Sequence, residues 1–220
     1  MNNLAITNCI SFICAGAAFA YGAYKYLRPK CPLYIQMIVM GVGCIMLGRL
    51  YQFLRILTGS SISDRAQLGM LGAAGAFAFF FSANFGQVDS LVDDGSSVFK
   101  KYRMAAIIAP VCIALLYLGF VLTDVSLGFK ISMGLVCLFI MAASYYHLKH
   151  LMIPDVDYGV VRCQRKYNAL ALAYALLYIP SQIALVTEHE PVTMALDIVM
   201  GIISVLIVIA ADRGVKQWNR

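Results

Sequence analysis

The sequence predicts an all-α membrane protein, a seven-transmembrane helix bundle that forms a single domain over residues 1–220. Of the 220 residues, 61% are hydrophobic and only 13% are charged, whereas soluble domains carry about 25% charged residues. The apolar residues gather in seven runs, and about 20 helical residues suffice to cross the hydrocarbon core of a bilayer. We therefore expect an integral multi-pass protein, located in a plasma membrane or a bacterial inner membrane.

The seven expected spans cover residues 4–24, 33–57, 66–87, 104–124, 129–150, 168–187 and 191–212. No basic residues precede the first span, so it does not read as a cleaved signal peptide. The second span carries Arg49 inside its apolar run. The third is rich in glycine and alanine, which allows neighbouring helices to approach closely. The sixth contains Pro180, which removes one backbone donor, and the seventh contains Asp197.

The positive charges predict how the bundle is oriented, because lysine and arginine accumulate in cytoplasmic loops. Thirteen of the 17 basic residues follow spans one, three or five or lie in the C-terminal tail. We therefore expect the N-terminus outside and the C-terminus inside. The thirteen are Lys25, Arg28, Lys30, Lys100, Lys101, Arg103, Lys149, Arg162, Arg165, Lys166, Arg213, Lys216 and Arg220.

Two halves of the chain resemble each other weakly. Residues 68–86 and 196–214 have equal length and similar ends, and residues 20–27 align with 144–151. Gln52 and Gln182 fall at nearly the same offset in spans two and six. Spans one to three would then match spans five to seven, with span four as connector. This 3+1+3 internal repeat predicts two parallel halves related by an axis along the membrane normal.

The 3+1+3 layout with its N-terminus outside resembles the PQ-loop and SWEET-type sugar transporters and the KDEL receptors. The resemblance covers the whole chain but consists of topology and length. The proline–glutamine pairs that mark the family are missing, since spans one and five contain no proline. Microbial rhodopsins share the orientation, but span seven has no lysine to hold retinal. No family is assigned on this basis.

Polar residues in the outer halves of spans two, six and seven predict a ligand-binding cavity that opens to the outside. A charged residue at this depth is costly, by at least ~2.5–3.5 kcal/mol, unless it faces a partner or water. Arg49 and Asp197 could form a purely structural ion pair, or Arg49 could bind an anionic or zwitterionic ligand. The expected ligand-binding residues are Arg49, Tyr51, Gln52, Tyr178, Ser181, Gln182 and Asp197.

Two polar clusters lie on the inner side. One comprises Asp89, Asp93 and Asp94, and the other comprises His147, His150, Asp155 and Asp157. Clustered carboxylates and histidines can bind metal ions, but contact with solvent or lipid headgroups is the expected role. We predict no metal site, no catalytic residue and no cofactor.

The sequence contains no nucleophile elbow, P-loop or dinucleotide-binding fingerprint. A small-molecule transporter is the first candidate function. The alternative is a ligand-sensing receptor or membrane subunit that acts through a membrane or cytoplasmic partner protein. A membrane enzyme using one of the inner clusters comes third. The expected partners are the lipid bilayer and a small-molecule ligand, with no nucleic acid.

Overall fold

The computed structural model describes residues 3–59, 68–86, 88–154 and 159–218, and every regular element in these ranges is helical. The all-α class predicted from the sequence is therefore confirmed. The elements are α1 (Asn3–Tyr26), α2 (Leu33–Leu57), α3 (Leu68–Phe85), α4 (Asp89–Val92), the 3₁₀ turn η1 (Ser97–Phe99), α5 (Lys100–Ala106), α6 (Ile108–Val121), α7 (Leu127–Met152), α8 (Val160–Val186) and α9 (Glu190–Trp218).

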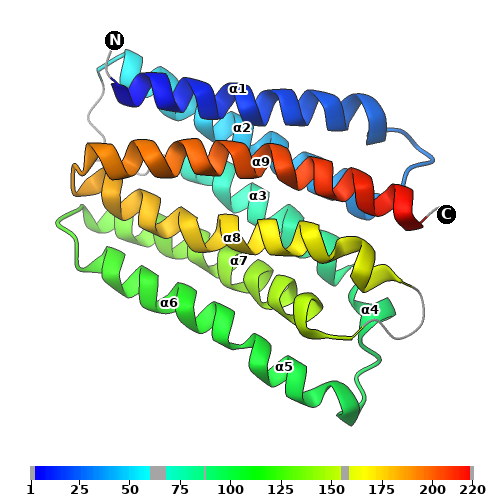
Figure 1. The fold of residues 1–220 in the computed structure, drawn as a ribbon. Helices are drawn as coiled ribbons and strands as arrows, with labels where there is room; N and C mark the ends of the chain where they lie inside the picture. Colours follow the sequence, from blue (N-terminus) through cyan, green and yellow to red (C-terminus); the bar gives the residue numbers. More distant parts are fainter. Residues whose placement is uncertain (1–2, 60–67, 87, 155–158, 219–220) are drawn as a thin grey trace.

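Seven helical segments are long and apolar enough to cross a membrane, which makes the chain an integral multi-pass membrane protein. Its seven long helices lie side by side, with α1 beginning at one end of the bundle and α9 ending at the other (Figure 1). We call these the N-terminal end and the C-terminal end of the bundle. Under the predicted orientation, the N-terminal end faces outside.

Two spans begin at least seven residues earlier in the structure than the sequence predicts. The fourth starts at Ser97 instead of residue 104 and consists of η1, α5 and α6. The sixth, α8, starts at Val160 instead of residue 168, directly after Gly159, whose φ of +66° is left-handed. The first two turns of α8 carry charges on their exposed side and bury Val161, Gln164 and Tyr167. Hydropathy alone misses such a segment because its charged side points away from the bundle.

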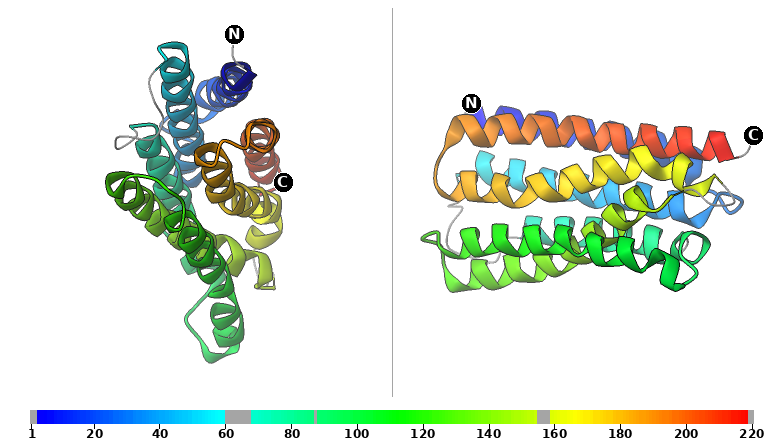
Figure 2. Two further views of the ribbon diagram at one scale, coloured as in Figure 1. Left: turned by 90° about the vertical axis from the view of Figure 1, so that its left-hand side faces the viewer. Right: turned by 60° about the horizontal axis from the view of Figure 1, so that its bottom comes forward.

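Six of the long helices form a closed ring of neighbours in the order α1, α2, α3, α7, α8, α9 and back to α1. The helix α6 lies outside this ring, against α7 and α8 (Figure 2). Many large apolar side chains of α6 and α7 are exposed, as expected for helices facing lipid. Consecutive helices are neighbours in both halves: α1 contacts α2 and α2 contacts α3, just as α7 contacts α8 and α8 contacts α9. The internal repeat and the orientation remain predictions.

The close contact between α2 and α3 depends on glycine. A Cβ atom on Gly72 would lie 2.7 Å from the carbonyl oxygen of Cys44 and 2.8 Å from the Cα of Gly48. These are backbone atoms, which cannot move aside as a flexible side chain could. The small residues of the third span therefore do permit the close approach expected from the sequence.

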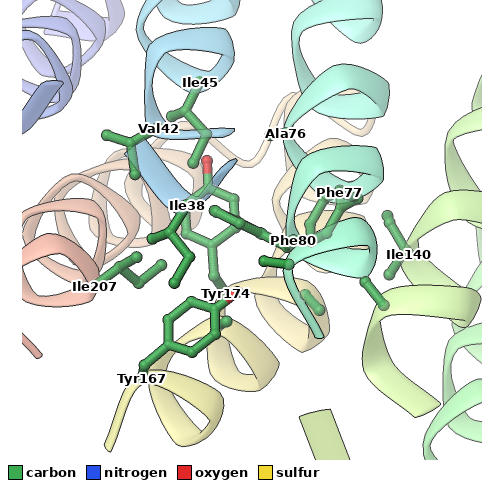
Figure 3. Packing of buried hydrophobic residues seen from close by; sticks show 14 of the residues in the cluster. Ile38, Val42, Ile45, Ala76, Phe77, Phe80, Ile140, Tyr167, Tyr174 and Ile207 are labelled. Carbon is green, nitrogen blue, oxygen red and sulfur yellow. The ribbon is translucent and has the colours of Figure 1, made fainter. Parts of the chain in front are cut away.

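The middle of the bundle is filled by apolar and aromatic side chains from α2, α3, α7, α8 and α9 (Figure 3). Phe77 of α3 packs edge-on against Tyr178, and its ring centre lies 6.0 Å from that of Tyr174. One turn further along α3, Phe80 contacts Tyr167 and His147. This aromatic layer separates the polar groups at the N-terminal end from those at the C-terminal end.

Candidate functional site

A buried ion pair joins α2 to α9 near the N-terminal end of the bundle. The Nη1 atom of Arg49 lies 2.5 Å from Oδ1 of Asp197, and the two residues are 6% and 3% exposed. Asn8 of α1 donates its amide to the other carboxylate oxygen at 3.1 Å. Arg49 also donates to Gln52 at 3.3 Å. The pairing considered from the sequence is therefore present, and it binds three helices together.

The ion pair borders a cavity between the start of α1, the end of α2, the end of α8 and the start of α9. The space between its walls amounts to about 410 Å³, including the part open to solvent. The centre of a water molecule fits in only about 20 Å³ of it, so a larger ligand requires the walls to separate. The lining residues are Asn8, Arg49, Gln52, Arg55, Ile56, Ser181, Gln182, Leu185, Thr193 and Asp197.

Five of the seven residues expected to bind ligand line this cavity: Arg49, Gln52, Ser181, Gln182 and Asp197. Tyr178 lines an adjoining cavity, together with Tyr174, and this second cavity shares Arg49 and Gln52 with the first. Tyr51 lines neither cavity; its ring lies 6.0 Å from the guanidinium carbon of Arg55. The helix α8 runs through Pro180 as one continuous element.

The other five lining residues were not among those expected: Asn8, Arg55, Ile56, Leu185 and Thr193. Asn8 is the one amide side chain in the first expected span, residues 4–24, and it lies at the same end as Asp197. That amide was the feature of the sequence that could have indicated its place in the site. The Oδ1 atom of Asn8 and the Oε1 atom of Gln182 are buried, and neither has a hydrogen-bond partner in the described part of the chain. A buried polar atom without a partner costs about 1–3 kcal/mol, so both atoms favour a ligand that donates hydrogen bonds.

At the other end of the bundle, the two inner clusters expected from the sequence partly meet. The ammonium group of Lys149 contacts Asp89 and lies 3.1 Å from Asp93, and His150 Nε2 lies 3.0 Å from Asp89. Arg103 reaches Asp93 at 2.7 Å. These carboxylates are thus neutralised by basic side chains, which leaves a divalent cation little charge to attract it.

Among the residues that the structure describes, no group of three or more His, Cys, Asp or Glu side chains is arranged to hold a metal ion. Asp155 and Asp157 lie outside the described residues. Burial alone would raise the pKa of Asp93, but the Gly95 N–H hydrogen bond and the charges of Lys149 and Arg103 outweigh it. Together they hold the pKa of Asp93 below its usual value.

A second ionic cluster at the C-terminal end links α1 to α9. Asp212 of α9 contacts Lys25 and the hydroxyl of Tyr26, and it lies 2.8 Å from Lys216 one turn further along α9. These residues join the first and last spans at the C-terminal end, where the Asp89 cluster joins α4 to α7. Ion pairs between helices therefore occur at both ends, and the cavity lies beside the pair at the N-terminal end.

The chain matches no protein-family model, no curated protein and no solved structure. Its fold identifies it as an integral membrane protein with seven candidate spans.

Proposed function

We propose that this protein is a small-molecule transporter whose substrate binds in the cavity beside Arg49 and Asp197. The observation that supports the proposal is the buried Arg49–Asp197 ion pair. It borders a cavity instead of being enclosed by other side chains on every side. A charged pair at this depth is costly, and such residues usually mark a substrate or ion pathway. The expected site residues Arg49, Tyr51, Gln52, Tyr178, Ser181, Gln182 and Asp197 are retained in this proposal, with Tyr51 in a supporting position behind Arg55.

The lining favours a zwitterionic substrate that carries both an anionic group and hydrogen-bond donors. The charged side chains on the lining are Arg49, Arg55 and Asp197, so it presents both guanidinium and carboxylate groups. A guanidinium recognises carboxylate or phosphate oxygens in bidentate geometry. The unpartnered oxygens of Asn8 and Gln182 require donors, such as an ammonium or hydroxyl group. A small amino acid carries this combination of groups.

Transport is favoured over binding alone by the difference between the two ends. The cavity lies at the N-terminal end, while ion pairs formed by Asp89, Asp93 and Asp212 cross between helices at the C-terminal end. In a transporter that works by alternating access, one of the states has its binding site accessible from one end of the bundle and closed at the other. Pro180, which removes one backbone donor from the continuous helix α8, lies beside the lining residues Ser181 and Gln182.

The test uses cysteine reactivity in protein from which the seven native cysteines, none of which forms a disulfide, have been replaced. Gln52→Cys and Gln182→Cys should react with a membrane-impermeant thiol reagent added outside. Leu54→Cys is the matched control, because Leu54 belongs to the same turn of α2 but is an exposed apolar side chain facing lipid, where a charged reagent does not react. Inert cavity positions, or reaction only from inside, would contradict the outward-facing site.

Substrate binding is tested by a thermal-shift screen of the purified protein against small amino acids and related zwitterions. A compound that stabilises the wild type should fail to stabilise the double variant Arg49→Leu with Asp197→Leu. The same compound should then be taken up by proteoliposomes and should protect Gln182→Cys from the reagent. Binding without uptake would exclude transport and favour the alternative, a receptor that acts through a partner protein.

A further inference from the structure

A separate polar cluster connects α3, α7 and α8 in the half of the bundle nearer the C-terminal end. Its centre is His147 of α7, whose Nδ1 atom lies 2.8 Å from the amide nitrogen of Asn84 and 2.9 Å from the amide oxygen of Asn168. Asn84 also donates to Asn168 at 2.9 Å. All three residues are fully buried, although they lie within apolar membrane-spanning segments.

The two asparagines allow His147 to exist in either neutral form. When Nδ1 is unprotonated, it accepts from the Asn84 amide; when Nδ1 carries the proton, it donates to the Asn168 oxygen. A histidine with a purely structural role usually has one partner that selects one tautomer. Here a donor and an acceptor lie within hydrogen-bond distance of the same nitrogen, so moving the proton between the ring nitrogens leaves Nδ1 with a partner.

His150 lies one turn further along α7 and connects this cluster to the C-terminal end. Its Nε2 atom is 3.0 Å from the carboxylate of Asp89, which is partly exposed. The other ring nitrogen, Nδ1, is buried without a hydrogen-bond partner among the described residues, and so is Nε2 of His147. Gln164, one turn before Asn168 in α8, is also buried, and both of its amide atoms lack a partner among the described residues.

Among the residues that the structure describes, few charged or titratable groups surround the two histidines. On the α4 side, Asp89 contacts His150, and Asp93 just beyond α4 is neutralised by Lys149 and by Arg103 of α5. Tyr146 of α7 packs against His150 and Tyr167 of α8 packs against His147. The α3 residues facing His147 are Phe80 and Asn84, which do not titrate.

We propose that His147 is a proton-binding site, supplied from the C-terminal end of the bundle through Asp89 and His150. A proton delivered by Asp89 adds to Nε2 of His150, and the proton on Nδ1 of that ring leaves through water to Nε2 of His147. His147 is then an imidazolium that keeps Nδ1–H toward Asn168 and carries the second proton on Nε2. One proton enters and one moves on, and only N–H and O–H bonds change.

As a proton site, the cluster stands on its own geometry. As the site of the ion to which uptake is coupled, it rests on the proposed transport function. The transport proposal and the proton-site proposal can fail separately, because cysteine reactivity tests the outer cavity and nuclear magnetic resonance of the histidine rings tests the inner cluster.

The chain has three histidines, and the third, His189, is an exposed residue between α8 and α9. The variant His189→Gln therefore leaves only the two rings of interest for ¹⁵N nuclear magnetic resonance in lipid nanodiscs, and His150→Gln assigns them. We expect His147 to populate both tautomers, to exchange its ring proton with water, and to become imidazolium as the pH is lowered. His150→Gln should slow that exchange several-fold.

The asparagines provide a matched pair of variants with opposite expected shifts. Asn168→Leu removes the acceptor and should move His147 toward the Nε2–H form, whereas Asn84→Leu removes the donor and should move it toward the Nδ1–H form. A single tautomer in His189→Gln protein, with no water exchange and no titration before unfolding, would overturn the proposal. That result needs no asparagine variant, so it remains decisive if those variants fail to fold.

Discussion

Removing one partner of the Arg49–Asp197 pair should destabilise the protein, and removing both should restore most of the loss. In Arg49→Leu, the buried carboxylate of Asp197 keeps, of the side-chain donors that the structure describes, only the Asn8 amide at 3.1 Å. Breaking a buried pair in this way costs about 3–5 kcal/mol in soluble proteins. In membranes, the unfolded state also finds partners, which reduces interhelical hydrogen bonds to about 0.6–1.7 kcal/mol. Between these limits, we expect a loss of about 2 kcal/mol for each single variant.

The double variant Arg49→Leu with Asp197→Leu should lie within about 1 kcal/mol of the wild type, because no buried charge is left without a partner. The measurement is reversible unfolding of the purified protein in mixed micelles, analysed as a double-mutant cycle. Lys216→Leu serves as the exposed comparison, since its side chain is 60% exposed although it pairs with Asp212. An exposed pair contributes about 0–1 kcal/mol, so this variant should change stability little.

Strictly additive losses of stability in the cycle would show that the two charges do not stabilise each other. That result would contradict the paired site at Arg49 and Asp197. A double variant that is less stable than either single variant would point the same way. Equal losses in Lys216→Leu and Arg49→Leu would show that burial does not set the cost. Asp197→Asn separates charge from shape, because it keeps a hydrogen-bonding group of the same size while removing the negative charge.

Two further predictions concern helix packing and acid stability. Gly72→Ala should destabilise the protein by about 1–3 kcal/mol through overpacking, whereas Gly128→Ala, whose added methyl meets no neighbouring atom, should be neutral; equal effects on thermal unfolding would contradict the glycine contact. Asp93 has a lowered pKa, so its stabilising contribution is present above the unfolded pKa of about 3.9 and is lost as the pH falls through the lower folded value. Asp93→Asn should therefore be less stable than the wild type at neutral pH, and the difference should close in acid; a difference independent of pH would refute this.

Much of the membrane topology could be predicted because spanning is a local property of the chain. In lipid, each crossing segment must satisfy its own backbone hydrogen bonds, so a sufficiently long apolar run must become a helix. The same reasoning led to Arg49 and Asp197, since two opposite charges at similar depth lower their cost by meeting. Gln52, Ser181 and Gln182 were expected beside them for the same reason, and they line the same cavity.

Only the tertiary structure decided which faces of the helices meet. Apolar residues surround most of these helices, so their sequence does not distinguish a side facing lipid from one facing a neighbour. The position of α6 outside the ring, the lining by Asn8 and the assembly of Asn84, His147 and Asn168 all depend on that choice. Asn84 and Asn168 are 84 residues apart along the chain, and only lateral packing of α3 against α7 and α8 brings their amides to one histidine. The sequence by itself determined that this chain crosses the membrane as seven helices, and the packing determined which of its few polar groups lie together.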